Sequence, residues 1–274
     1  MNSRRSQEAM RTGAVKGPGR RSQGALGWIL PAVLFVALIG LWQALTDTGL
    51  LSGALGIDRI LVPAPSEVGQ SLWENRSLLA DNAWVTLREV GLGFAVAVAA
   101  GLGFAVILHL SETLRRALYP LLVASQTVPI VVVAPILVIW FGYGVGPKLG
   151  IIALICFFPI TVNALDGLRS VDPDAVKMMR TLDGSRAQIF TRVEAPAALP
   201  YAFSGAKIAV AVAVIGAVFG EWAGASSGLG YLINQDNANL LTARVFASVV
   251  LLSAMAILLF AALSALERAV VRWR

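Results

Sequence analysis

Residues that could carry catalytic chemistry are few and isolated in this sequence. His109 and Cys156 are each the only residue of their type, and both lie in apolar runs. Several ligands would be needed for a metal site, and a nucleophile would need a base beside it. The sequence also contains no G-x-x-x-x-G-K-[ST] loop of the kind that cradles nucleotide phosphates. We therefore expect no catalytic residue, no bound metal and no cofactor on this chain.

A second group of candidates consists of polar residues and prolines inside apolar stretches. Pro129 and Pro135 share one stretch with Gln126, and two prolines there predict a kinked or broken helix. Within a membrane, broken backbone survives where protein buries it or where it lines a cavity. Lys207 and Glu221 share one face of a later helix, and a charge facing lipid is costly. All five are candidates for a pathway. Packing by neighbours, snorkelling of Lys207 and an interfacial role for Glu221 remain alternatives.

The elements that must position these residues are membrane-spanning helices. Mean hydropathy is +0.74, with 57% hydrophobic and 14% charged residues, which is too apolar for an ordinary soluble domain. A spanning helix needs about 20 apolar residues, and only helices satisfy their backbone in lipid without neighbours. The sequence predicts an all-α integral membrane protein of about six spans, near residues 26–45, 83–110, 118–141, 149–165, 201–222 and 243–266.

Charge placement predicts the orientation of the chain. Residues 1–25 are basic and lack apolar periodicity, which predicts a disordered cytoplasmic tail before a membrane domain at 26–274. Most of the 22 Lys and Arg residues fall in that tail, in two internal polar segments and at the C-terminus. This bias predicts that both termini are cytoplasmic. It also accounts for the sequence pI near 10.0 without nucleic-acid binding.

The longest internal polar segment, residues 168–200, predicts a helical hairpin. Asp172 can cap a first helix that begins at Pro173. Gly184 suits a left-handed residue just past the end of that helix. One face of the helix is apolar and comprises Ala175, Met178, Met179 and Leu182. In so apolar a chain, this face predicts a binding partner.

A second helix of the hairpin follows directly. Ser185 and Gln188 have the spacing of a capping box. Ile189 and Phe190 give this helix apolar side chains, and Pro196 predicts its end.

The hairpin resembles the cytoplasmic EAA loop of permease subunits of binding-protein-dependent ABC importers. Val193-Glu194-Ala195-Pro196 stands where that loop has Ile-x-Leu-Pro. The position of the loop's conserved glycine falls on Asp183, one residue before Gly184. Lys177-Met178-Met179 replaces Glu-Ala-Ala, which is a clear departure.

Other segments extend the resemblance over about residues 28–270. They are LVPAPSEVGQSLWE, SQTVPIVVVAPILVIWFGYGVGPK, RTLDGSRAQIFTRVEAPAALPYAFSGAKIA and GAVFGEWAGASSGLGYLI. They are similar to the nitrate/taurine/sulfonate-type branch of these permeases, and within it to the group for pyrimidine thiamine precursors.

This resemblance implies a type I ABC importer permease fold in a bacterial inner membrane. It implies two copies of the chain, two cytoplasmic ATPase subunits that bind ATP and Mg²⁺, and a periplasmic or lipid-anchored solute-binding protein. The solute would be small and polar or anionic. The ATPase-coupling residues would be Lys177, Arg180, Asp183, Gly184, Ser185, Arg186, Gln188, Ile189, Phe190 and Pro196.

Three alternatives remain open from the residues alone. The hairpin could lie on lipid headgroups through its basic residues. The chain could be a self-sufficient ion-coupled transporter, although no convincing inverted repeat supports this. An intramembrane enzyme would need a cluster of catalytic side chains that the sequence does not show.

Overall fold

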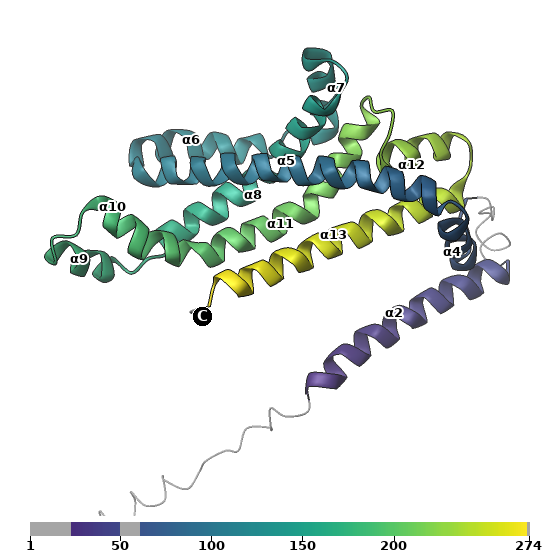
Figure 1. Ribbon diagram of the computed structural model, residues 1–274, viewed down its shortest axis with the longest axis horizontal. Coiled ribbons are helices and arrows are strands. Elements are labelled where there is room, and N and C mark those ends of the chain that lie inside the picture. Colours follow the sequence, from purple (N-terminus) through teal and green to yellow (C-terminus); the bar gives the residue numbers. More distant parts are fainter. Residues whose placement is uncertain (1–22, 50–60, 273–274) are drawn as a thin grey trace, which may run out of the picture. The chain divides into compact units, whose positions relative to one another are not determined.

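A computed structural model describes residues 23–49 and 61–272, and its regular elements there are all helices (Figure 1). The predicted tail at 1–25 lies almost entirely outside these residues. The helices are α2 (Gln23–Asp47), α4 (Pro65–Glu74), α5 (Arg76–Leu110), α6 (Glu112–Ser125), α7 (Ile130–Phe141), α8 (Val145–Arg169), α9 (Pro173–Thr181), α10 (Arg186–Ile189), α11 (Ala195–Trp222), α12 (Leu229–Ala238) and α13 (Thr242–Val270). A wide π-type turn, Phe190–Glu194, joins α10 to α11.

Five of the described helices are long and apolar enough to cross a membrane, or six spans if the bent pair α6–α7 counts as one. The predicted all-α fold of about six spans is therefore confirmed. Several spans are longer than hydropathy predicted. The second begins at Arg76 instead of near residue 83, because polar residues continue its first turns. Contacts divide the chain into two units, with α2 in the first and the helices from α5 to α13 in the second.

The core of the second unit consists of α5, α8 and α11, with α8 packing most extensively on the other two (Figure 1). Close approach depends on glycines in the contact faces. A Cβ at Gly93 would lie 2.7 Å from the Ile152 side chain, and one at Gly205 would lie 2.5 Å from the Pro159 carbonyl oxygen. Small residues of this kind let helix backbones approach in membranes. The core thus forms by close packing of three long helices.

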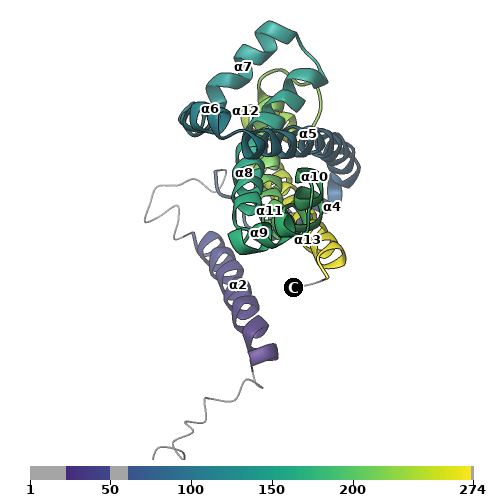
Figure 2. The ribbon, with the colours of Figure 1, turned by 90° about the vertical axis from the view of Figure 1, so that its left-hand side faces the viewer.

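The third predicted span is broken, as its prolines indicated. The axes of α6 and α7 differ by 100°, and α7 rises away from the bundle in two perpendicular views (Figures 1 and 2). Pro129 stands just before α7 in an extended conformation. Pro135 does not break the chain and lies inside α7. Gln126, Pro129 and Pro135 are all exposed.

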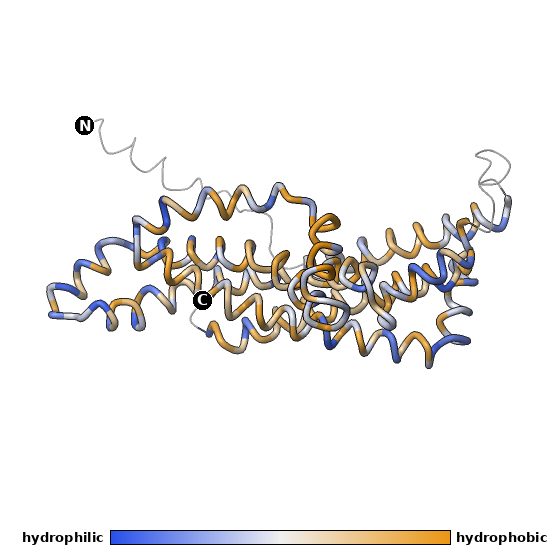
Figure 3. The backbone as a smooth tube through the Cα atoms, turned by 90° about the horizontal axis from the view of Figure 1, so that it is seen from above, coloured by the Kyte–Doolittle hydropathy of each residue, from blue (hydrophilic) through white to orange (hydrophobic). Residues whose placement is uncertain are grey.

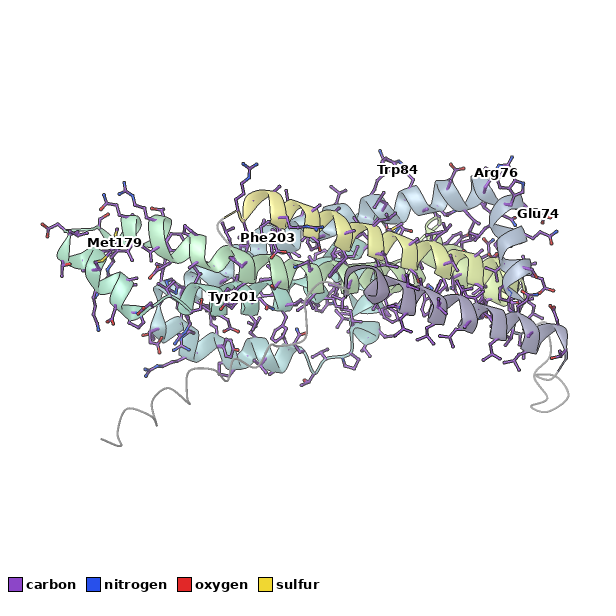
Figure 4. All side chains as sticks on the ribbon, turned by 90° about the horizontal axis from the view of Figure 1, so that it is seen from below. Glu74, Arg76, Trp84, Met179, Tyr201 and Phe203 are labelled. Atoms are coloured by element: carbon purple, nitrogen blue, oxygen red, sulfur yellow. The ribbon has the colours of Figure 1, made fainter. Side chains whose placement is uncertain are left out.

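The bundle has hydrophilic segments at both ends and apolar helices between them (Figure 3). The hairpin of α9 and α10 is mostly hydrophilic, whereas the helices behind it are mainly apolar (Figure 3). Met179 lies in that hairpin at one end of the bundle. Arg76 and Trp84, in the first part of α5, lie toward the other end (Figure 4). α12 lies at this opposite end, after α11 (Figure 1).

Candidate functional site

The first hairpin helix, α9, has its N-terminus capped as predicted. The Asp172 carboxylate accepts a hydrogen bond from the Asp174 backbone N–H at 2.8 Å, and Pro173 is the first helical residue. Every residue of α9 is at least partly exposed. On its apolar side Met178 is 61% exposed, and Leu182, just after the helix, is 70% exposed.

The turn after α9 corrects the prediction for Gly184. The left-handed residue is Asp183, with φ of +54°. Its N–H donates to the Arg180 carbonyl, and the Gly184 N–H donates to the Met179 carbonyl, which is a Schellman arrangement. Asp tolerates the left-handed region better than most residues. Gly184 is needed for a different reason, because a Cβ there would lie 2.6 Å from the Met179 oxygen.

The second hairpin helix begins with the predicted capping box. The Ser185 hydroxyl accepts from the Gln188 N–H, and the Gln188 side chain accepts from the Ser185 N–H. The chain then stays helical from Arg186 to Trp222, so Pro196 does not end the helix. It is accommodated by the wide turn before it, in which the Ala195 N–H bonds to the Phe190 carbonyl five residues back.

The predicted coupling residues occupy different environments. Ile189 is only 5% exposed and packs within the permease, so its side chain is not presented on the surface of this chain. Phe190 is half-buried, with its ring centroid 6.4 Å from that of His109. Gly184 and Pro196 are also half-buried. The exposed members are Lys177, Arg180, Asp183, Ser185, Arg186 and Gln188.

At the opposite end of the bundle, Glu221 forms a buried contact with the start of α12. Its side chain is 1% exposed. One carboxylate oxygen accepts from the Thr86 hydroxyl at 2.7 Å, and the other accepts from the backbone N–H groups of Gly230 and Tyr231. These two N–H groups lie in the first turn of α12. N–H groups in the first turn of a helix have no acceptor within that helix. Glu221 therefore acts as a cap supplied by another helix.

Two residues of α5 complete this cap. The Gly228 N–H donates to the Asn82 amide oxygen at 2.7 Å, and the Leu229 N–H donates to the Thr86 hydroxyl oxygen at 2.8 Å. We call Asn82, Thr86, Glu221 and the backbone N–H groups of residues 228–231 the α12 capping network. It satisfies the four donors at the start of the helix from two other helices, α5 and α11.

Glycines make room for the capping network. Gly228 has φ of +116°, and a Cβ there would lie 2.2 Å from the Glu221 carboxyl carbon. A Cβ on Gly230 would lie 2.8 Å from a Glu221 oxygen. The Trp222 ring N–H also donates to the Gly230 carbonyl at 2.9 Å. The Gly-Leu-Gly sequence is thus explained by close approach to a buried carboxylate.

Sequence reasoning missed an ion pair beside this network. The Lys148 ammonium lies 2.6 Å from the Glu89 carboxylate, and both side chains are buried. Arg88, the basic residue next to Glu89 in the sequence, stacks on the Trp84 ring and does not pair with Glu89. The only signal in the sequence is that Glu89 lies near the start of one predicted span and Lys148 stands just before another.

The remaining predicted pathway residue also has a partner. Lys207, on α11, lies 2.8 Å from the Glu267 carboxylate on α13, and both side chains are mostly buried. This is a side-chain contact between two spans, whereas the sequence left a pathway role and snorkelling of Lys207 open. Lys207 and Glu221 are therefore both engaged by the fold itself.

These features define a class of multi-span helical membrane proteins with a capped, exposed hairpin at one end. Residues 93–273 match the family described as binding-protein-dependent transport system inner membrane component, and the chain belongs to that family. It is 36% identical over 245 residues to the formylaminopyrimidine transport permease protein ThiX of Halalkalibacterium halodurans, covering 89% of this chain and 95% of ThiX. It is 30% identical over 262 residues to the putative aliphatic sulfonates transport permease protein SsuC of Bacillus subtilis, covering 94% and 91%.

A solved structure shares the fold. The MetNI methionine ABC transporter, in inward-facing conformations, contains a chain that superposes with a TM-score of 0.64, at 21% identity, over 72% of this chain and 98% of that one. The type I importer permease fold is thus confirmed.

Family membership establishes the general role of the chain. It is the multi-pass membrane permease subunit of an ATP-driven importer and is not itself an enzyme. ATP is used by a partner ATPase, and a solute-binding protein is the other partner. The alternative of a self-sufficient ion-coupled transporter is not favoured.

Proposed function

We propose that the hairpin at residues 168–200 is the element that docks on the ATPase. The observation that carries this proposal is the exposure of Met178 on α9 and of Leu182 just after it, at 61% and 70%, where both ends of α9 are capped. A capped helix holds its shape without burial, and exposed apolar residues gain free energy when a partner covers them.

Charges around this apolar face suit a protein partner. Arg180 and Arg186 are exposed, and Lys177 bonds to Asp174 at 2.8 Å on the same helix. Charged residues around an apolar centre are the usual anatomy of a protein interface. Ile189 anchors the second helix from inside, and it serves docking by fixing the hairpin.

We propose further that two copies of the chain form the pathway and that both termini lie on the cytoplasmic side with the hairpin. The bent pair α6–α7 supplies the pathway candidates Gln126, Pro129 and Pro135, which are exposed in the single chain. Lys207 and Glu221 are engaged within the fold, so we assign them no contact with solute.

The solute we propose is a small polar or anionic organic molecule, of which an aminopyrimidine is the first to test. The relatives named above support this class: ThiX is named for formylaminopyrimidine transport and SsuC for transport of aliphatic sulfonates. Because those solutes differ in charge and shape, the binding protein is the expected source of selectivity.

The docking proposal is tested with two matched leucines. Leu182 in the hairpin is 70% exposed, and Leu240 at the opposite end is 62% exposed. We expect Leu182→Asp to weaken ATPase co-elution from the co-expressed complex by about tenfold or more, as at an interface hot spot. Leu240→Asp should leave co-elution unchanged. Affinity is measured by titrating purified ATPase onto the permease in lipid nanodiscs.

Two results would contradict the proposal. Equal loss with both variants would mean that neither leucine marks the interface. Full ATPase affinity with Leu182→Asp, together with weaker binding of the hairpin to anionic vesicles, would place the hairpin on lipid headgroups.

A further inference from the structure

The junction between the hairpin and α11 is a mechanically weak point in an otherwise continuous helix. Residues Arg186–Trp222 form one helical run, but the wide turn Phe190–Glu194 interrupts its hydrogen-bond register. A π-type turn closes through a longer ring than an α turn and commonly marks functional sites. Pro196 removes a further backbone donor just beyond it. Force from the hairpin can reach α11 through this turn, and the short link at residues 170–172 joins the other side of the hairpin to α8.

One residue from another helix contacts the turn at both of its ends. His109 is the penultimate residue of α5 and the only histidine in the sequence. Its Nε2 lies 2.9 Å from the Glu194 carboxylate, at the end of the turn. Its ring centroid lies 6.4 Å from that of Phe190, at the start of the turn. His109 thus spans the wide turn from the side.

The contact is partly shielded from water and from competing charges. The His109 and Glu194 side chains are 16% and 18% exposed. The nearest acidic residue along α5 and α6, Glu112, is engaged by Arg115 and Arg116. A charge-assisted hydrogen bond in such a site is stronger than one on an open surface. The His109–Glu194 contact can therefore stabilise the wide turn, whose own backbone hydrogen bonds depart from the α-helical pattern.

We propose that His109 and Glu194 form a positioning tether that fixes the direction of the hairpin relative to α5 and α11. The tether makes the wide turn transmit motion of the hairpin to the bundle instead of flexing. Neither residue contacts solute or nucleotide in this proposal. The role in transmission rests on the proposed docking of the hairpin on the ATPase, whereas the tether itself does not.

The tether is tested first on the permease alone, in nanodiscs. Spin labels are placed at exposed positions, through Asp174→Cys on α9 and Thr113→Cys on α6, and the native Cys156 is buried. We expect His109→Ala to broaden the distance distribution between the labels clearly. His109→Gln keeps an N–H donor for Glu194 and should restore the narrow distribution.

A matched ion pair serves as control. Lys207–Glu267 has the same kind of contact between helices, at 2.8 Å with 21% and 14% exposure, but lies away from the turn. Lys207→Ala should lower stability about as much as His109→Ala does and leave the distance distribution narrow. An unchanged distribution in His109→Ala, or equal broadening in Lys207→Ala, would overturn the tether.

Transmission is tested in the assembled complex. The readout is the stimulation of ATP hydrolysis by the solute-binding protein, which needs communication across the membrane domain. We expect His109→Ala to retain bound ATPase but to lose about tenfold in stimulation, the lower end of the scale of one hydrogen bond to a charged group. His109→Gln should recover most of it. Normal stimulation in His109→Ala, together with a broadened distance distribution between the labels, overturns transmission. Full ATPase affinity in Leu182→Asp overturns docking instead.

Discussion

The two ends of the α5–α8–α11 bundle satisfy their polar groups in different ways. At the α12 end, Glu221 and Thr86 are buried and bond to backbone that lies elsewhere in the chain. At the hairpin end, Asp172 and Ser185 cap helices within three residues of themselves and remain exposed. At the α12 end, other helices of the chain satisfy and bury the polar groups. At the hairpin end, the backbone groups are satisfied locally, but the side chains around them stay exposed.

This difference teaches how one subunit can be rigid at one end and available at the other. Buried polar networks are costly to break, so they hold one arrangement. Locally capped helices keep their shape without burial, so they can present side chains to a partner. α11 runs from the hairpin junction to Glu221, so one helix connects the exposed end to the buried network.

The largest expected effect tests the fixed end through its ion pair. Lys148→Met leaves Glu89 charged and buried without its partner, which we expect to lower the free energy of unfolding by about 4 kcal/mol. Thermal unfolding of the purified permease in detergent measures this as a lower Tm. Adding Glu89→Leu should recover most of the loss, because apolar pairs replace buried ion pairs at little cost. A double variant as unstable as Lys148→Met would show that the pair is not the cause.

The next prediction tests whether Glu221 stabilises the capping network through its negative charge or through its hydrogen bonds. Glu221→Ala leaves two α12 N–H groups without acceptors, and we expect a loss of about 2–3 kcal/mol. Glu221→Gln keeps one oxygen for those groups, and its NH₂ can donate to the Thr86 hydroxyl, which is also 3.2 Å from the Asn82 carbonyl. The glutamine variant should therefore stay within about 1 kcal/mol of the wild type. Tm values of the two variants decide this, and equal losses would mean that the negative charge itself is required.

The features that could be predicted from the sequence are those set by residues close together in the chain. Hydropathy predicted the spans, and Pro129 predicted the break in α6–α7, because both signals are local. The Ser185 capping box was likewise predicted from a spacing of three residues. The bonds of the capping network from α5 join residues 135 to 146 positions apart, and no local pattern indicates such partners. The exposed side of the hairpin was predicted, but the burial of Ile189 depends on packing that spacing does not define.

The smallest expected effect concerns the turn after α9, where sequence reasoning chose the wrong residue. Because Asp183 holds the left-handed φ of +54°, Asp183→Gly should be neutral or gain about 0.5 kcal/mol locally. Because a Cβ on Gly184 would lie 2.6 Å from the Met179 oxygen, Gly184→Ala should cost about 1–2 kcal/mol there. Hydrogen exchange of peptides from residues 173–190 measures both, with about tenfold faster exchange expected for Gly184→Ala. Exchange at residues 229–238 should not change in either variant, because the hairpin satisfies its backbone locally. Faster exchange at both ends would show that the two ends are one cooperative unit, and the contrast drawn between them would then fail.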